Sequence, residues 1–318
     1  MNSSARTTVV VHAIRLEAEG IVSVELRAVL GESLPRFSAG AHLDLHLPND
    51  MVRSYSLCSS PADRSRYVVG VMNDRKSRGG SRYIHEHLRV GSRIDISGPR
   101  NHFELDEGAK SSVLVAGGIG VTPILCMFDR LRDIGRPVEL IYCARSRRVA
   151  AFVTELSMSD SPVTLHFDDE TGHAARLPEL LKGRDSDAHY YCCGPAPMLE
   201  AFEAACRDLG YANVHIERFA AADEVESSQK SGYDVHLKQS GRTLNVFPGI
   251  VLLDALLDVG IDLPYSCREG ICGACEVKVL EGTPDHRDFI LSERERTDGK
   301  VMMPCVSGCR GAALTLDL

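Results

Sequence analysis

The chain has 318 residues, of which 44% are hydrophobic and 25% are charged, a composition typical of a globular protein with more than one domain. Its 36 Lys and Arg residues are outnumbered by 44 Asp and Glu residues, and with a net charge of −8 we expect neither a nucleic-acid partner nor a polybasic membrane patch. The chain is long and has 11 cysteines, an odd number that a disulfide framework cannot pair completely. We therefore expect a cytoplasmic protein with reduced thiols.

The first hundred or so residues consist of short apolar or alternating runs. Gly, Pro, Asn and Asp separate these runs, which are TTVVVHAIRL, IVSVELRAV, HLDLHL, YVVGVM and RIDISG. Alternation of this kind with frequent turn residues predicts an antiparallel β-barrel.

From Ser111 the pattern changes to apolar strands that alternate with helical stretches. The segments in order are SVLVAGG, ILCMFDRLRDIG, VELIYCA, VTLHF, AHYYCCGP and MLEAFEAACRDLG. This alternation predicts an α/β domain with a parallel sheet. Glycines and a proline interrupt the most apolar window, Ser111 to Phe128, so it reads as strand, loop and helix start and not as a membrane span.

A glycine cluster, VLVAGGIGVTP from Val113 to Pro123, lies between an apolar run and a helical run. Backbone N–H groups at such a turn bind pyrophosphate, although a glycine turn in an α/β domain is often only a turn. A second loop, YYCCGPAPM, follows about 70 residues later, also at a predicted strand end. In an open parallel sheet two such loops face one ligand-binding crevice.

The barrel region carries two strings that suit a flavin phosphate and ring. RSYSLCSS, from Arg53 to Ser60, offers a cation, an aromatic ring and hydroxyls, and RGGS, from Arg78 to Ser81, adds backbone amides and a hydroxyl. Taken alone, each string is more often a surface strand or turn than a cofactor site. Their position upstream of the glycine cluster favours a cofactor site.

The polar tract AADEVESSQKSG, from Ala221 to Gly232, predicts a linker. After it come two alternating runs joined by Ser-Gly and then the helix-like IVLLDALLDVG.

Four cysteines near the C-terminus have metal-ligand spacing: Cys267, Cys272, Cys275 and Cys305 form C-x4-C-x2-C-x29-C. The first three match the plant-type 2Fe-2S spacing, and Gly270 and Gly273 permit a tight loop whose N–H groups approach the sulfurs. A zinc site is the alternative, because Cys305 and Cys309 form a short knuckle. We interpret Cys309 as a non-ligand.

On these motifs the last ninety or so residues resemble plant-type ferredoxins, including the lead-in from Pro264 to Arg268, and residues 1 to about 220 resemble the ferredoxin-NADP reductase superfamily. The R-x-Y-S, GGIG-x-TP and CGP-x-x-M motifs occur in the family order. With its ferredoxin domain last, the whole chain resembles the phthalate dioxygenase reductase and vanillate demethylase reductase family. That resemblance implies an FMN-binding barrel (1–106), an NAD-binding α/β domain (107–221), a linker (222–231) and a β-grasp α+β ferredoxin domain (232–318).

The resemblance also assigns residues to cofactors. It implies FMN as the flavin, with FAD as the alternative, and NADH as the donor, with NADPH as the alternative because Arg145, Arg147 and Arg148 suit a 2′-phosphate. The flavin residues are Arg53, Tyr55, Ser56, Gly80, Ser81 and Phe219. The nicotinamide and pyrophosphate residues are Gly118, Gly120, Thr122, Pro123, Arg145, Cys193 and Gly194, and the cluster ligands are Cys267, Cys272, Cys275 and Cys305.

A flavin converts a two-electron hydride into single electrons, which explains why a nicotinamide site, a flavin site and an iron-sulfur site would share a chain. The resemblance implies a two-component system whose acceptor is a terminal Rieske-type oxygenase. A reductase serving a cytochrome P450 or a diiron monooxygenase, and a redox sensor, are the alternatives.

Overall fold

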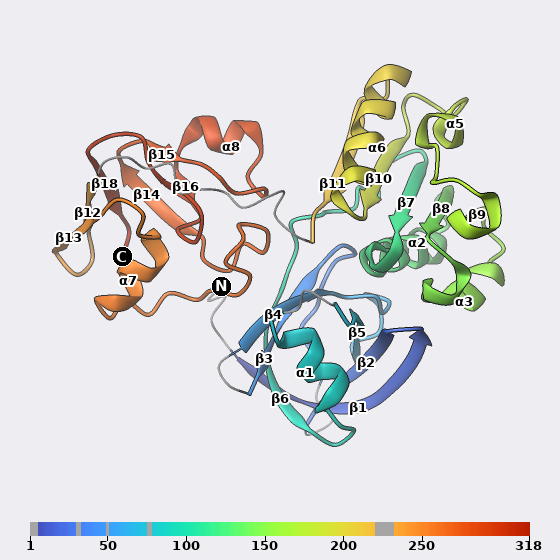
Figure 1. Cartoon of the computed structure of the whole chain (residues 1–318), viewed down its shortest axis with the longest axis horizontal. Helices are drawn as coiled ribbons and strands as arrows, with labels where there is room; N and C mark the ends of the chain where they lie inside the picture. Colours follow the sequence, from blue (N-terminus) through green and yellow to red (C-terminus); the bar gives the residue numbers. More distant parts are fainter. Residues whose placement is uncertain (1–5, 30–32, 49–50, 75–77, 220–231) are drawn as a thin grey trace. The chain divides into compact units, whose positions relative to one another are not determined.

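The computed structural model describes residues 6–29, 33–48, 51–74, 78–219 and 232–318. The chain divides into two compact units, residues 1–219 and 220–318, and each is described by itself (Figure 1). The expected linker, 222–231, lies outside the described residues.

The first sheet of unit 1 is antiparallel throughout, with the strand order β4-β3-β6-β1-β2-β5. Its strands are β1 (Thr7–Ala18), β2 (Ile21–Ala28), β3 (His42–Leu47), β4 (Met51–Ser56), β5 (Tyr67–Met72) and β6 (Arg93–Arg100). Leu57, just after β4, bridges Val69 of β5, and the Cys58 N–H donates to the Val68 carbonyl at 2.9 Å. These bonds join the two ends of the sheet into a closed barrel.

Alternate side chains of the barrel strands fill its interior, as the period-2 pattern predicts. Val9, Val11, Leu43, Leu45 and Val69 are fully buried there. The short helix α1 (Gly80–Glu86) packs against β4 and β5.

The second sheet of unit 1 is parallel, with the strand order β11-β10-β7-β8-β9. Its strands are β7 (Ser112–Gly117), β8 (Val138–Ala144), β9 (Val163–Phe167), β10 (His189–Cys193) and β11 (Asn213–Glu217). The connecting helices are η1 (Gly118–Gly120), α2 (Val121–Asp133), η2 (Arg147–Val149), α3 (Val153–Ser157), α4 (Asp168–Thr171), α5 (Leu177–Leu181) and α6 (Ala196–Leu209). The chain runs outward from β7 to β9 and then returns to the other side of β7, so the topological switch point lies between β7 and β10.

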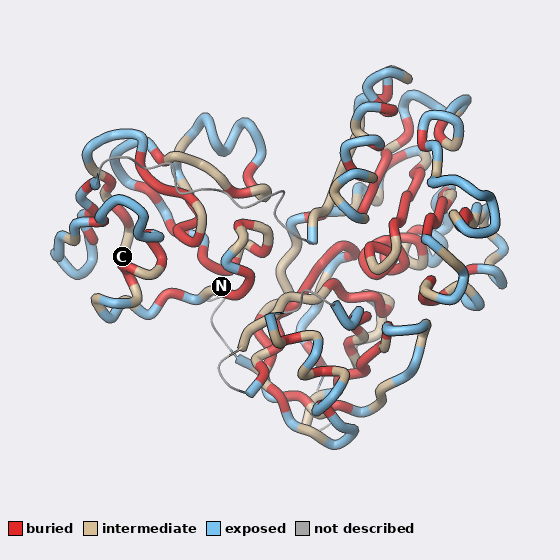
Figure 2. The backbone as a smooth tube through the Cα atoms, in the orientation of Figure 1, coloured by how far each residue is buried: buried red, intermediate tan, exposed pale blue. Residues whose placement is uncertain are grey.

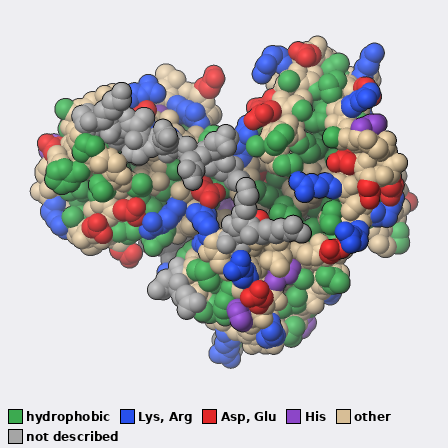
Figure 3. Space-filling view, viewed as in Figure 1, with side chains coloured by type: hydrophobic (Ala, Val, Ile, Leu, Met, Phe, Trp, Pro, Cys, Tyr) green, Lys and Arg blue, Asp and Glu red, His purple; other side chains and the backbone are tan. Residues whose placement is uncertain are grey.

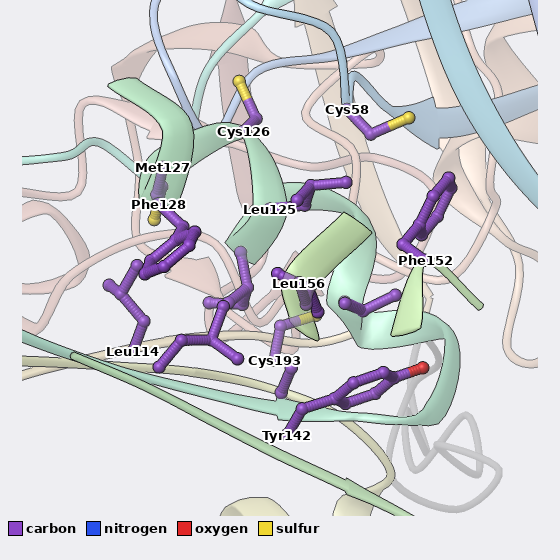
Figure 4. Packing of buried hydrophobic residues seen from close by; sticks show 14 of the residues in the cluster. Cys58, Leu114, Leu125, Cys126, Met127, Phe128, Tyr142, Phe152, Leu156 and Cys193 are labelled. Atoms are coloured by element: carbon purple, nitrogen blue, oxygen red, sulfur yellow. The ribbon is translucent and has the colours of Figure 1, made fainter. Parts of the chain in front are cut away.

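Helices cover both faces of this sheet, with α2 and α3 on one side and α5 and α6 on the other (Figure 1). Strand residues alternate between the two layers, and the strands are the most buried parts of the unit (Figure 2). Leu114, Tyr142 and Cys193 face the α2 layer, where Phe128 also packs (Figure 4). The same apolar cluster includes Ile21 and Phe103 from the barrel side, so the barrel and the parallel sheet form one compact unit.

Unit 2 has a mixed sheet with the order β13-β12-β18-β14-β16, in which β12 and β18 are parallel. Its strands are β12 (Tyr233–Leu237), β13 (Arg242–Val246), β14 (Val277–Glu281), β15 (Pro284–Asp285), β16 (Val301–Met302), β17 (Gly308–Cys309) and β18 (Ala313–Leu316), and its helices are α7 (Leu252–Asp258) and α8 (Glu293–Asp298). Apolar residues of α7, including Leu252, Leu253 and Leu256, pack on this sheet. The predicted hairpin is β12 and β13, which pair in antiparallel register around Gly241.

The predicted fold class is therefore confirmed: an antiparallel barrel, a parallel α/β sheet and a β-grasp unit follow one another along the chain. None of the helices in the described residues has the length and apolar character that crossing a membrane requires.

Candidate functional sites

Strand β4 places a cation, Arg53, beside the start of α1. The Arg53 guanidinium donates to the carbonyl of Arg78 at 2.9 Å and to that of Val52 at 2.7 Å. A Cβ on Gly80 would lie only 2.4 Å from Cγ of Arg53, so the glycine leaves room for the arginine side chain. The Ser81 hydroxyl accepts a hydrogen bond from the Asp74 N–H at 3.4 Å. Four predicted elements of a phosphate site, a cation, backbone amides, a glycine and a hydroxyl, are thus close together.

Tyr55 and Ser56 follow Arg53 on the same strand. Tyr55 is half-buried, and burial raises its pKa, so its ring stays neutral. Ser56 is buried, and its hydroxyl donates to Oε2 of Glu217 at 3.5 Å. Glu217 ends β11 and is the register partner of Cys193 in β10, whose thiol also hydrogen bonds to its carboxyl. These three side chains join the barrel to the parallel sheet.

Burial in this position raises the pKa of Glu217 to about 8, and the hydrogen bonds from Cys193 and Ser56 oppose that rise only in part. Burial likewise raises the pKa of the Cys193 thiol well above its usual range. At neutral pH the group is therefore a protonated carboxyl next to a neutral thiol and a hydroxyl. As long as the carboxyl keeps its proton, no charge lies between the two sheets.

The two glycine-bearing loops meet at the switch point. A Cβ on Gly120 would lie 2.2 Å from the carbonyl oxygen of Cys193 and 2.8 Å from the N of Gly194. A Cβ on Gly117 would lie 2.9 Å from Cδ of Pro195 and 3.2 Å from Cα of Gly194. The loops after β7 and β10 therefore touch backbone to backbone, and residues with side chains would force them apart. Gly118, with φ +53°, adds a left-handed turn that favours glycine.

Thr122 and Pro123 begin α2 and are buried. The Thr122 hydroxyl donates to the Ile119 carbonyl at 3.1 Å, and its methyl group lies over Gly70 of β5, where a Cβ would approach it to 2.5 Å. Thr122 thus links the nucleotide-type loop to the barrel. Phe219, at the end of unit 1, is 38% exposed and offers an accessible aromatic ring.

The arginines after β8 differ in their surroundings. Arg147 donates to Glu170 at 3.1 Å and stacks on the Phe167 ring, with its guanidinium carbon 4.5 Å from the ring centroid. Arg148 is paired with Glu19 at 3.0 Å. Arg145 is exposed, and its carbonyl accepts the Asp169 N–H at 3.1 Å. Two of the three cations are therefore already paired with carboxylates.

In unit 2 the four spaced cysteines come together and are all buried. The Cys267 thiol contacts the thiols of Cys272 and Cys305, and Cys305 also contacts Cys275. Among the residues that the structure describes, no three His, Cys, Asp or Glu side chains are grouped as for a single metal ion. A plant-type 2Fe-2S cluster would take these four thiolates as its ligands.

The backbone of this loop supports the sulfurs. The Glu269 N–H donates to Sγ of Cys267 at 3.3 Å, and the Cys267 N–H donates to Sγ of Cys272 at 3.5 Å. Arg268, Gly270 and Gly273 all have positive φ, near +60°, which turns successive N–H groups toward the inside of the loop. Contact with the Cys267 thiol and burial raise the pKa of Cys272. Crowded thiols of this kind ionise together only when a metal supplies compensating positive charge, so the donor set fits an iron-sulfur cluster.

Cys309 has different surroundings. It lies in β17, where its Sγ accepts the Gly311 N–H at 3.2 Å and its thiol faces the Ala313 carbonyl at 3.5 Å. Its sulfur is thus hydrogen-bonded to backbone groups of the following turn, while the side chain packs in the apolar core of unit 2.

Sequence reasoning missed Glu217. The family motif in the segment HIERFA indicates only Phe219, although an acidic residue at the carboxyl end of an edge strand is a recognisable signal. The residue becomes a candidate only when β11 is placed beside β10, since that pairing sets it against Cys193 and Ser56.

These features define a class of protein, the flavin-dependent reductases joined to a 2Fe-2S ferredoxin. They are a closed barrel, a parallel sheet with two meeting loops at its switch point and a cysteine-rich β-grasp unit. A family profile described as 2Fe-2S iron-sulfur cluster binding domain matches residues 235–310.

Curated relatives match over nearly the whole length. The chain is 49% identical over 308 residues to phenoxybenzoate dioxygenase subunit beta of Ectopseudomonas oleovorans, covering 97% of this chain and 96% of that protein. It is 42% identical over 316 residues to a vanillate O-demethylase oxidoreductase of a Pseudomonas species, covering 98% and 99%.

Two solved structures cover 99% of the chain. Phthalate dioxygenase reductase, described as a modular structure for electron transfer from pyridine nucleotides to [2Fe-2S], matches with TM-score 0.73, 34% identity and 98% of its own length. An intact type IV self-sufficient cytochrome P450 monooxygenase matches with TM-score 0.91 and 41% identity, and the chain spans 41% of that longer protein. The chain therefore belongs to the phthalate dioxygenase reductase family and is an oxidoreductase of the kind that supplies electrons to oxygenase systems.

Proposed function

We propose that the chain takes a hydride from NADH onto FMN and passes single electrons through its 2Fe-2S cluster to the terminal oxygenase of a two-component Rieske-type system. The observation that carries this proposal is the hydrogen bond between Ser56 and Glu217, because it brings the R-x-Y-S strand of the barrel to the meeting point of the two glycine loops. Hydride transfer requires the nicotinamide and the flavin ring to lie close together, and this junction is where the two proposed sites meet.

We assign residues 1–106 to flavin binding, 107–221 to pyridine-nucleotide binding and 232–318 to the cluster. When bound, a flavin accepts two electrons together and releases them one at a time. Arg53, Gly80 and Ser81 would hold its phosphate, since they supply charge, backbone amide and hydroxyl side by side. Tyr55, Ser56 and Phe219 would contact the ring system, and the protonated Glu217 keeps that region uncharged.

The loops after β7 and β10 would bind the pyridine nucleotide. Gly118 has open space beside it and would let a diphosphate approach the backbone, and Gly120 would keep its loop packed against Cys193. Thr122 and Pro123 start α2 behind this loop, and Cys193 and Gly194 would border the nicotinamide. Arg145 directly follows β8, the strand beside β7, and is an exposed cation at the carboxyl end of the sheet.

The pairing of the neighbouring arginines supports NADH over NADPH. Arg147 and Arg148 are paired with Glu170 and Glu19, so a 2′-phosphate held by these arginines would lie close to two carboxylates. Cys267, Cys272, Cys275 and Cys305 would ligate the cluster, and their burial keeps water away from the sulfurs.

The test is the visible spectrum of the purified full-length chain before and after one equivalent of NADH without oxygen. We expect flavin absorption overlaid on 2Fe-2S bands, with both bleached by NADH, and FMN released on denaturation. NADPH should act with a much lower kcat/KM. Flavin bands without cluster bands would reject the four-cysteine assignment, and a colourless zinc protein would reject the whole proposal.

A second acceptor is supported by the similarity to the reductase part of the self-sufficient P450 monooxygenase. If a P450 haem domain is the acceptor, NADH and this chain will reduce its haem to the ferrous state, which added carbon monoxide traps as the carbonyl form, whereas a Rieske oxygenase will be reduced slowly. The reverse order of rates supports the proposed partner.

A further inference from the structure

Asp288, in the loop between β15 and α8, is a buried carboxylate. On the face of the molecule shown in Figure 3, acidic and basic side chains are interspersed, and water stabilises their charges. Asp288 lacks that stabilisation, because only 1% of its surface is exposed. A buried carboxylate requires hydrogen-bond donors and positive charge within the fold, so its partners show which segments it holds together.

The carboxylate of Asp288 connects three segments of unit 2. Its Oδ2 accepts the N–H groups of Ile290 at 3.2 Å and Leu291 at 2.9 Å, which closes the turn after Asp288. The same oxygen lies 3.8 Å from the Arg296 guanidinium of α8, which also donates to the Asp288 carbonyl. Its Oδ1 accepts the Ser307 hydroxyl at 3.5 Å. The carboxylate thus joins its own turn, α8 and the segment of Ser307.

Ser307 belongs to the segment that carries a proposed cluster ligand, since it lies two residues after Cys305. It is buried, and its N–H donates to the Met303 carbonyl at 2.9 Å. Its hydroxyl accepts the Arg287 N–H at 3.2 Å while it donates to Asp288. Two neighbouring residues of the Asp288 loop therefore hold the chain just beyond Cys305.

The backbone of the Asp288 loop also packs on Gly270, which lies in the cysteine-bearing loop of residues 267–275. The Phe289 N–H donates to the Gly270 carbonyl at 2.9 Å. A Cβ on Gly270 would lie 3.0 Å from Cα of Asp288 and 2.7 Å from Cγ2 of Val306. Gly270 therefore has no free space on this side, and a shift of the Asp288 loop would move it.

Gly270 in turn contacts a proposed ligand, because its N–H donates to the sulfur of Cys305. An N–H group that donates to a ligating sulfur stabilises negative charge on that sulfur. Since the reduced form of a 2Fe-2S cluster carries one more negative charge than the oxidised form, such hydrogen bonds raise its reduction potential. The position of this N–H therefore affects how readily the cluster accepts an electron.

We propose that Asp288 is a positioning residue for the 2Fe-2S cluster. Through Ser307 and the backbone of Gly270, its carboxylate keeps the Gly270 N–H on the sulfur of Cys305 and so raises the reduction potential of the cluster. The inference rests on the proposed function only in requiring that the four spaced cysteines ligate a 2Fe-2S cluster. It does not depend on the flavin, the nucleotide or the electron acceptor.

The experiment uses the full-length holoprotein and separates the charge of Asp288 from its positioning role, since negative charge by itself lowers the potential of a cluster. Asp288→Asn removes the charge but keeps the shape, because its amide oxygen still accepts both N–H groups of the turn and its amide nitrogen donates to Ser307. Asp288→Ala removes both the charge and the hydrogen bonds. Ser307→Ala keeps the carboxylate and breaks only its link to the Cys305 segment.

Asp285→Asn is the matched control for the loss of a carboxylate. Asp285 lies in β15, where its side chain pairs with Arg287 at 2.7 Å and with Arg310 at 3.4 Å and is 26% exposed. Because water screens this charge, the control should change the equilibrium constant for cluster reduction less than about twofold.

The measurement is an anaerobic titration with dithionite in the presence of redox dyes, in which one ferric iron of each cluster takes up one electron and becomes ferrous. The equilibrium constant for this step should be about tenfold lower in Asp288→Ala than in Asp288→Asn, since a hydrogen bond to a charged acceptor contributes about this factor. Tenfold corresponds to about 59 mV for one electron. Ser307→Ala should fall below the wild type by about three- to tenfold. The visible circular dichroism of the cluster should match the wild type in Asp288→Asn and differ in Asp288→Ala.

Equal potentials for Asp288→Ala and Asp288→Asn would overturn the proposal, since Asp288 would then act through its charge alone. A wild-type potential in Ser307→Ala would overturn it as well, and this comparison decides the question if Asp288→Ala fails to assemble a cluster. Wild-type protein without cluster bands would reject the proposed function together with this inference. A normal wild-type cluster whose potential none of the variants shifts would reject this inference and leave the proposed function standing.

Discussion

The contact between the two strand-end loops gives a sharp prediction for Gly120→Ala. Gly120 has φ −60° and ψ −6°, an ordinary right-handed backbone that alanine adopts without strain. The new methyl group would nevertheless lie 2.2 Å from the carbonyl oxygen of Cys193. To reach ordinary contact the two loops must separate by about 1 Å or more. The obstacle is backbone, which cannot rotate aside as a flexible side chain can.

The expected cost follows from that geometry. Inserting a methyl group into a packed position destabilises a protein by about 1–3 kcal/mol. Replacing glycine by alanine also lowers the conformational entropy of the unfolded chain, but this stabilises the folded state by only about 0.4–1 kcal/mol. A shift of about 1 Å at a binding loop lowers kcat/KM by up to about 100-fold. We therefore expect a lower melting temperature and a 10- to 100-fold loss of kcat/KM for NADH, by order of magnitude.

The assay is stopped-flow reduction of the holoprotein by NADH, together with thermal unfolding monitored by circular dichroism. Gly108→Ala is the control, because its Cβ would meet only the side-chain oxygen of Asp106 at 3.1 Å. Flavin and iron content should be unchanged in both variants. Wild-type melting temperature and wild-type NADH kinetics in Gly120→Ala would refute the argument that backbone contact at the switch point requires glycine.

Three further predictions concern the other parts of the sites. Burial raises the pKa of Glu217 from 4.5 to about 8, so between these pH values the folded chain binds a proton that the unfolded chain has lost. The free energy of unfolding should therefore fall as pH rises through this window, by at most about 5 kcal/mol. Denaturant titrations should show this fall in the wild type and not in Glu217→Gln. Cys305→Ser should lose the 2Fe-2S absorption bands and most of its iron, whereas Cys309→Ser should keep both; iron retention by Cys305→Ser would contradict the ligand assignment. Arg53→Ala should lose flavin during gel filtration, and Arg15→Ala, a change at an exposed cation on β1, should not.

The barrel shows how far pattern reasoning extends. Alternation predicts the strands and their inward faces correctly, because side chains of a strand point to opposite faces whatever its neighbours are. The closure of the sheet between Leu57 and Val69 has no local signal. Register between strands depends on long-range packing, so it appears only in the folded chain.

The nucleotide-type loop shows the same division. Its glycines follow an apolar run and precede a helix, which predicts a strand, a turn and a helix start. The reason why Gly120 cannot carry a side chain lies in the backbone of Cys193, more than seventy residues away. Glu217 depends even more on the tertiary structure, since its partner Ser56 is 161 residues distant in the sequence. No motif at either residue predicts that the two are in contact.

The sequence by itself determined the order of the three architectures, the cysteine spacing and the glycine positions of this protein. These features are local, because each depends only on residues that are close together in the sequence. They are the ligand spacing along one loop, the alternation of side chains and the need for positive φ. Only the tertiary structure decided that the barrel strand with Ser56 meets the edge strand with Glu217, and that the two glycine loops touch. Those meetings depend on how distant strands pack and pair, and no stretch of consecutive residues contains that information.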